Sequence, residues 1–135
     1  MYTSDIRTLI IEDNICKAMD IKEALKSNGI KNIIHLDNQE EAWEVIVNKH
    51  QGNNIDLIVT DMQYPMSHNS IIDEEAGFKL IERLNREEIN IPVVVCSSIN
   101  YRIPGILGCI WYNKLRDLQE DFNRLLEKLS NVNLK

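Results

Sequence analysis

The sequence lacks the features that mark several classes of protein. Its three cysteines, Cys16, Cys96 and Cys109, are odd in number and far apart, and no CxxC pair occurs, which argues against a zinc knuckle or a disulfide framework. No apolar run approaches the roughly 18 residues that a membrane-spanning helix needs, and no basic start with an apolar segment opens the chain. We therefore expect a cytoplasmic protein.

Basic residues are fewer than acidic ones. The chain carries 15 Lys and Arg against 21 Asp and Glu, a formal net charge of −6, and it contains no block of Lys and Arg interleaved with aromatic residues. This balance argues against a nucleic-acid-binding surface. Glycine and proline are also scarce, and 44% of the 135 residues are hydrophobic, so we expect one ordinary globular domain over residues 1–135.

Short strands alternate with amphipathic helices along the chain. The expected strands are Arg7 to Ile11, Asn32 to Leu36, Ile55 to Thr60, Ile91 to Ser97 and Cys109 to Tyr112. The expected helices open at Asn14 and Asn38, cover Phe78 to Leu84, and run from Leu115 to Leu129, and Gly52-Asn53-Asn54 is an expected turn. Pro104 and Gly105 interrupt the segment from Ser98 to Gly108, so a fourth helix there is short or absent.

Five alternations of strand and helix predict an α/β fold. The expected architecture is a flavodoxin-like, doubly wound sheet of five parallel strands in the order 2-1-3-4-5, with helices on both faces. In that order the first and third strands are neighbours, and their carboxyl ends flank the position where such folds bind ligands. Residues just after these two strands are therefore the first candidates for a functional site.

Acidic residues follow both of these strands. Glu12 and Asp13 come directly after the first strand, and Asp61 comes directly after the third. Three carboxylates at one place repel one another unless a cation neutralises them, and Mg²⁺ is a natural partner for carboxylate oxygens. Ser97 and Lys114, at the ends of the fourth and fifth strands, add a hydroxyl and an ammonium. This set suits a site that receives a phosphoryl group, in which a carboxylate is the nucleophile and the other two groups bind the resulting anion.

Taken in order, these motifs resemble the receiver domains of two-component response regulators. The resemblance covers essentially the whole chain and rests on the segments Leu9 to Asn14, Leu57 to Met66, Pro92 to Ser97 and Trp111 to Lys114. It implies a switch that receives a phosphoryl group from a sensor histidine kinase or a phosphotransfer protein. Because only a few residues follow the last expected helix, we expect a stand-alone domain without an output domain. Such a switch acts through contacts with a downstream protein, binds neither nucleic acid nor membrane directly, and is not a turnover enzyme.

The resemblance also implies roles for single residues. Asp61 would be the phosphoacceptor, and Asp13, Asp61 and the backbone carbonyl of Gln63 would bind Mg²⁺ directly, with Glu12 acting through water. The remaining roles belong to the ends of the fourth and fifth strands: Ser97 as the switch hydroxyl, Lys114 as the partner of the phosphoryl group, and Trp111 as the aromatic switch residue. An indole is large and usually buried, however, so core packing is the favoured interpretation of Trp111.

Three places depart from the family pattern. The loop from Ser67 to Glu75 is long, and we interpret it as an exposed loop, with a lid or a partner contact through Ile71 and Ile72 as the alternative. The segment before Lys114 is short, as the interrupted fourth helix already indicates. Leu115 stands where a proline usually follows the lysine.

Other interpretations of the same residues stay open. The three acids could be helix caps and loop acids, Ser98 could take the place of Ser97, and Lys114 could be a solvated surface lysine. Two rival functions follow. One is a phosphorylation-independent interaction module, and the other is a Mg²⁺-dependent phosphohydrolase, for which the sequence offers no well-placed second general base.

Overall fold

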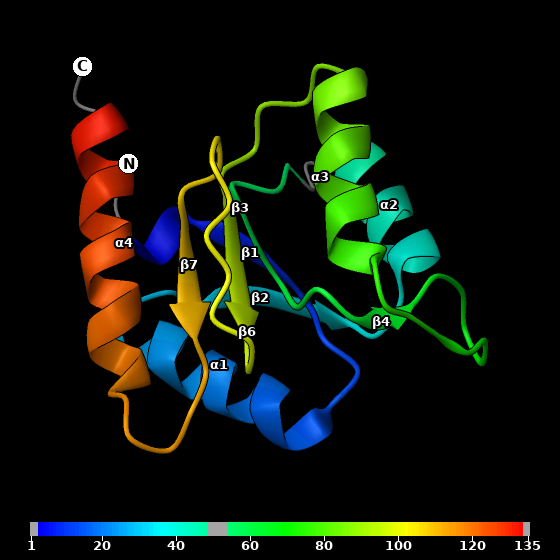
Figure 1. Cartoon of the computed structure of the whole chain (residues 1–135). Coiled ribbons are helices and arrows are strands. Elements are labelled where there is room, and N and C mark those ends of the chain that lie inside the picture. Colours follow the sequence, from blue (N-terminus) through cyan, green and yellow to red (C-terminus); the bar gives the residue numbers. More distant parts are fainter. Residues whose placement is uncertain (1–2, 49–53, 134–135) are drawn as a thin grey trace.

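A computed structural model describes residues 3–48 and 54–133, with side chains as far as residue 129. Within these residues five parallel strands form one sheet in the order β2-β1-β3-β6-β7 (Figure 1). The strands are β1 (Arg7–Ile11), β2 (Asn32–Leu36), β3 (Leu57–Thr60), β6 (Val93–Ser97) and β7 (Gly108–Trp111). The predicted strand order and the α/β fold are confirmed.

Helices cover both faces of this sheet. One face carries α1 (Ile15–Ser27) and α4 (Leu118–Asn133), and the other carries α2 (Gln39–Val47) and α3 (Ala76–Arg86) (Figure 1). Successive residues of a strand point to opposite faces, so Ile10 packs in the core under α1 and α4 while Leu9 and Ile11 pack under α2 and α3. Burial on both faces explains why the central strands are continuous apolar runs.

Side-chain caps start the first two helices where the sequence indicates. The side-chain oxygens of Asn14 and Asn38 accept hydrogen bonds from the backbone N–H groups of Lys17 and Glu41, each at 2.9 Å. Gly29, with a φ of 92°, follows α1 in the left-handed conformation that ends a helix readily. The cap at Asn14 also sets the rotation of the first turn of α1, which matters for the functional site.

The region after β6 confirms one prediction from the sequence and contradicts another. Between β6 and β7 the chain forms no helix, as the interrupted segment predicts. The last helix begins at Leu118 and not at Leu115, because the Asp117 side chain accepts a hydrogen bond from Glu120 N at 3.2 Å and caps the helix there. Leu115 therefore lies outside the apolar stripe, and its side chain is 98% exposed.

The long loop after β3 contains a small hairpin. Its two strands, β4 (Tyr64–Pro65) and β5 (Ile72–Asp73), pair in antiparallel fashion. The loop is tied to α2 because Glu40 N donates a hydrogen bond to Met66 O at 2.8 Å. Within Ser67 to Glu75 every residue is exposed except the half-buried Ser67 and Asp73, and Ile71, just before β5, is 90% exposed, so the interpretation of this segment as an exposed loop is confirmed.

Three further points complete the description of the chain. A single 3₁₀ turn, η1 (Thr3–Asp5), precedes β1. Gly52 and Asn53 of the predicted turn lie outside the described residues. In the part of the chain that the structure describes, no helix has the length and apolar character needed to cross a membrane.

Candidate functional site

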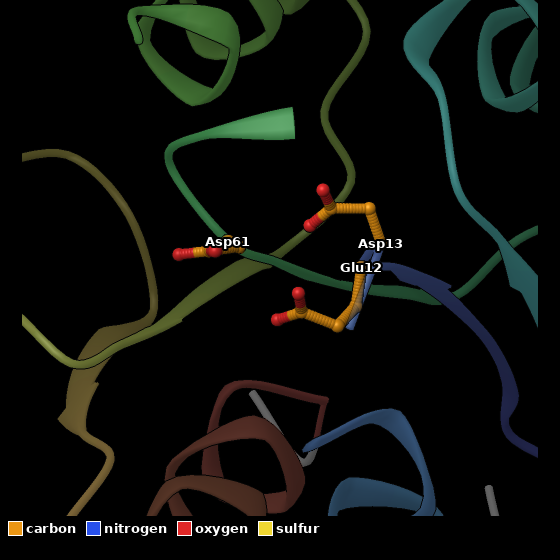
Figure 2. A group of neighbouring side chains, drawn as sticks. All are labelled: Glu12, Asp13 and Asp61. Carbon is orange, nitrogen blue, oxygen red and sulfur yellow. The ribbon is translucent and has the colours of Figure 1, made fainter. Parts of the chain in front are cut away.

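Three acidic side chains converge at the carboxyl end of the sheet. Glu12 and Asp13 follow β1, and Asp61 follows the neighbouring strand β3. The Asp61 N–H donates a hydrogen bond to Ile11 O at 3.1 Å, which continues the pairing of the two strands. One carboxylate oxygen from each acid lies within 4.8 Å of the others, and Figure 2 shows the three side chains extending into the same space. The structure thus brings together the three acids that the sequence singled out.

The three acids differ in their exposure to water. Glu12 is only 1% exposed, whereas Asp13 and Asp61 are half-buried. Burial raises the pKa of the Glu12 carboxyl to about 7, against the opposing attraction of the Lys17 ammonium, and the nearby Asp61 charge raises this pKa further. Glu12 is therefore the member of the cluster for which a neighbouring cation matters most.

The turn that carries Asp61 is fixed by its neighbours. Asp61 Oδ1 accepts a hydrogen bond from Met62 N at 2.8 Å, and Thr60 Oγ1 donates to the Asp61 carbonyl at 2.7 Å. From α3, Gly77 N donates to Met62 O at 3.0 Å. A Cβ atom at Gly77 would lie 2.8 Å from the Asp61 carbonyl oxygen, so this close approach of α3 requires glycine. The Asp61 carboxylate is thus held toward the cluster.

Lys17 is the residue of the site that we did not predict from the sequence. Its Nζ lies 2.7 Å from Glu12 Oε1 and 3.4 Å from Asp61 Oδ1, and the residue is only 7% exposed. Burial lowers the pKa of the ammonium, but the attraction of Glu12 and Asp61 outweighs burial, so the pKa lies above its ordinary value. The available signal was its spacing: Lys17 stands one turn before Ile21, within the apolar stripe of α1.

Ser97 and Lys114, which lie at or just after the ends of neighbouring strands of the sheet, differ in their surroundings. Ser97 ends β6, is 4% exposed, and its Oγ accepts a hydrogen bond from Ile99 N at 3.2 Å. Lys114 is exposed, forms no ion pair within the described residues, and lines a cavity of about 640 Å³ between α1 and the connection from β7 to α4. The ammonium beside Asp61 therefore belongs to Lys17.

The sequence and the geometry both match a known family. The family model of the response regulator receiver domain matches residues 8–103, a range that contains Asp13, Asp61 and Ser97. The chain belongs to this family. A comparison with curated proteins gives no match.

Solved structures share the receiver fold with this chain at low sequence identity. The signal receiver domain of a protein described as a LuxO repressor from Vibrio parahaemolyticus has a TM-score of 0.71 at 17% identity, and the match covers 96% of this chain and 93% of that one. A DNA-binding response regulator of the LuxR family from Staphylococcus aureus has a TM-score of 0.66 at 16% identity, with 91% and 97% of the chains covered. A sensor protein from Polaromonas has a TM-score of 0.66 at 18% identity, covering 94% and 98%. At these identities the likeness establishes the fold.

Trp111, at the end of β7, is exposed to solvent. Its side chain is 46% exposed, so the favoured expectation of core packing is wrong. Trp111 is the last residue of the edge strand β7, and the missing helix between β6 and β7 leaves this part of the sheet edge without a cover. The indole Nε1 donates a hydrogen bond to Ser98 O at 3.0 Å, which joins Trp111 to the residue after Ser97.

The acidic pocket of this receiver has a donor set that fits Mg²⁺. The carboxylates of Glu12, Asp13 and Asp61 are hard oxygen ligands of the kind that this ion prefers. Glu12 Oε1 is buried and has no well-aligned hydrogen-bond donor among the described residues, although Lys17 Nζ lies 2.7 Å away. Gln63 lies in the turn between Asp61 and β4, with its side chain exposed. The pocket thus offers oxygen ligands whose charge calls for a cation.

Proposed function

We propose that this receiver domain is a phosphoacceptor switch. Asp61 receives a phosphoryl group from a histidine kinase or a phosphotransfer protein in a Mg²⁺-dependent step, and the modified domain signals through contacts with a downstream protein. The observation that carries this proposal is the convergence of Glu12, Asp13 and Asp61 within 4.8 Å on a receiver fold. Receiver domains are signalling domains. In this proposal the domain catalyses its own phosphorylation and the later hydrolysis, and it does not turn over a substrate.

The chemistry assigns the nucleophile to one oxygen of Asp61. Oδ1 accepts a backbone hydrogen bond and lies 3.4 Å from Lys17 Nζ, which leaves Oδ2 as the attacking atom. Attack of Oδ2 on phosphorus forms an acyl phosphate while the bond from phosphorus to the donor's histidine nitrogen breaks, and that nitrogen keeps the electron pair. Asp13, Asp61 and the Gln63 carbonyl would hold Mg²⁺, with Glu12 acting through water, and the ion would neutralise phosphoryl oxygens during transfer.

Ser97 and Trp111 are the proposed route from the modified Asp61 to the surface. The phosphoryl oxygens are strong acceptors that attract the Ser97 hydroxyl, which ends β6. Because Ser98 O accepts the hydrogen bond from Trp111 Nε1, a shift at the end of β6 also moves an exposed indole. Lys114 stays the predicted second partner of the phosphoryl group, and to act in this way its ammonium has to approach Asp61, with which it forms no ion pair within the described residues.

A phosphorylation-independent interaction module is the second candidate function. Two observations favour it: no helix connects β6 to β7, and within the described residues Lys114 makes no ion pair with Asp61. The presence of all three acids at one place opposes it. A Mg²⁺-dependent phosphohydrolase on the same fold is a third and weaker candidate function, which rests on the same three acids.

The intact mass of the protein after incubation with acetyl phosphate tests the proposed function. With Mg²⁺ we expect a gain of one phosphoryl group, and with a chelator in place of Mg²⁺ we expect no gain, because the acid cluster repels an anionic donor without a metal ion. An unmodified protein that nevertheless binds Mg²⁺ would favour the phosphorylation-independent module. Release of inorganic phosphate over many turnovers would instead favour a phosphohydrolase.

A further inference from the structure

The position of Lys17 is built into the first turn of α1. Its backbone N–H donates a hydrogen bond to the Asn14 side chain at 2.9 Å, which fixes the start of the helix. Its side chain continues the inward stripe formed by Ile21, Ala24 and Leu25, and it is 7% exposed. The ammonium also lies 5.5 Å from the centre of the Tyr112 ring, within the range of a cation–π contact. The ammonium is therefore held beside the acids from several directions.

Lys17 divides the acidic cluster into two parts. Its ammonium lies against Glu12 and Asp61, whereas Asp13 forms no ion pair among the described residues. A buried lysine loses hydration, and this loss is offset only where opposite charges face it. An apolar side chain at this position would fill the stripe of α1 without that cost. Packing alone therefore does not account for a lysine here, whereas the charge of the acids does.

We propose that Lys17 is a built-in cation of the receiver site, which neutralises Glu12 and Asp61 without a metal ion and competes with Mg²⁺ for these two carboxylates. The inference rests on the proposed function, because it assumes that the acid cluster is the Mg²⁺ site. A divalent cation that enters the cluster meets the like charge of the ammonium and has to draw Glu12 and Asp61 away from it. Mg²⁺ affinity is then set by the chain's own lysine.

The test compares Mg²⁺ binding by the wild type, Lys17→Met and Lys26→Met, measured by calorimetry without any phosphodonor. Methionine keeps the length and apolar character of the lysine stem and removes the charge. Lys26 is an exposed residue of the same helix, so Lys26→Met is the matched control for the loss of one positive charge. We expect Lys17→Met to bind Mg²⁺ roughly tenfold more tightly or better than the wild type, and Lys26→Met to bind as the wild type does.

Thermal unfolding of the same proteins gives a second, independent measurement. Without Mg²⁺, Lys17→Met should unfold at a lower temperature than the wild type, because two acids lose their cation. Saturating Mg²⁺ should raise the unfolding temperature more in Lys17→Met than in the wild type, since binding to the folded state stabilises it in proportion to affinity. Lys17→Arg, which keeps the charge, should respond to Mg²⁺ less than Lys17→Met.

Each outcome bears on the inference. Equal or weaker Mg²⁺ binding by Lys17→Met, with clear binding by the wild type, would overturn the role of Lys17 and leave the proposed function intact. Failure of every variant to bind Mg²⁺ would overturn both, because removal of the competing charge would then have uncovered no metal site. If Lys17→Met unfolds without Mg²⁺ and folds with it, the inference is supported directly.

Discussion

Replacement of Asp61 by Asn should abolish modification of the protein by acetyl phosphate and Mg²⁺, and this is the largest functional effect that we expect. An amide cannot supply the attacking oxygen, and it removes one of the carboxylates of the cluster. Intact mass is the measurement. Asp117→Asn is the control, because it makes the same chemical change at the same end of the molecule and keeps an oxygen able to cap α4. A phosphorylated Asp61→Asn protein would show that another residue is the acceptor.

The Asp61→Asn protein should retain its fold, so the loss of modification can be assigned to chemistry. The amide oxygen still accepts the hydrogen bond that Asp61 Oδ1 receives from Met62 N. Removal of one negative charge also lowers the repulsion with Glu12, whose pKa the Asp61 charge helps to raise. Urea unfolding should therefore give a midpoint close to that of the wild type.

Gly77→Ala should be the most damaging small substitution near the site. The new Cβ would lie 2.5 Å from Met62 Sδ and 2.8 Å from both the Asp61 carbonyl oxygen and Met62 Cα. The two backbone atoms cannot yield unless the turn that carries Asp61 moves. We expect a loss of about 3 kcal/mol in the free energy of unfolding. Alanine is favoured over glycine within a helix by about 1 kcal/mol, so without the clash this substitution would raise the free energy of unfolding. A decrease would therefore point to the contact between α3 and the Asp61 turn.

Gly108→Ala is the matched control for this second prediction. A Cβ there would also meet an atom at 2.5 Å, but that atom is Cδ2 of the Leu125 side chain, whose end can rotate away. We expect a loss of about 1 kcal/mol or less for this variant, and little effect on the Asp61 turn. Equal losses for the two glycine variants in urea unfolding would contradict the claim that α3 presses on the backbone of the Asp61 turn.

The fold was predictable because its central strands carry a strong signal. Leu57 to Thr60 and Val93 to Ser97 are buried on both faces, and continuous apolar runs of this length that alternate with amphipathic helices are typical of a parallel sheet covered by helices. The strand order then follows from connection rules, and the order brings Asp61 beside the acids after β1. The convergence of the acids is thus a consequence of topology, which the sequence specifies well.

Residues whose environment depends on particular local or tertiary contacts were harder to predict. Lys17 interrupts an apolar stripe, and a periodicity argument treats such a residue as an exception and not as a signal. The apolar spacing also continues to Leu115, but the local cap at Asp117, with Glu120 three residues later, decides where the last helix begins. Local hydrogen bonds prevailed over the hydrophobic pattern at this helix start.

Two other errors have causes in the tertiary structure. Trp111 is exposed because no helix between β6 and β7 covers the edge beside β7. The prediction of burial used only the size of the indole, and that size does not show whether a neighbouring helix is present. The hairpin after β3 has strands of two residues, which are too short for an alternating pattern to appear in the sequence. Its pairing depends on contacts that only the folded chain supplies.

The most direct test of the central claim is to locate the phosphoryl group on the wild-type chain. Borohydride reduces an aspartyl phosphate to homoserine and leaves free carboxylates unchanged, so tandem mass spectrometry of the treated protein identifies the modified position. Our account predicts homoserine at position 61 after incubation with acetyl phosphate and Mg²⁺, because Asp61 alone joins the acid cluster from the end of β3. Homoserine at position 13 or at any other aspartate, the longer alcohol that a glutamyl phosphate would give at Glu12, or no reduced residue at all in a protein that binds Mg²⁺, would contradict it.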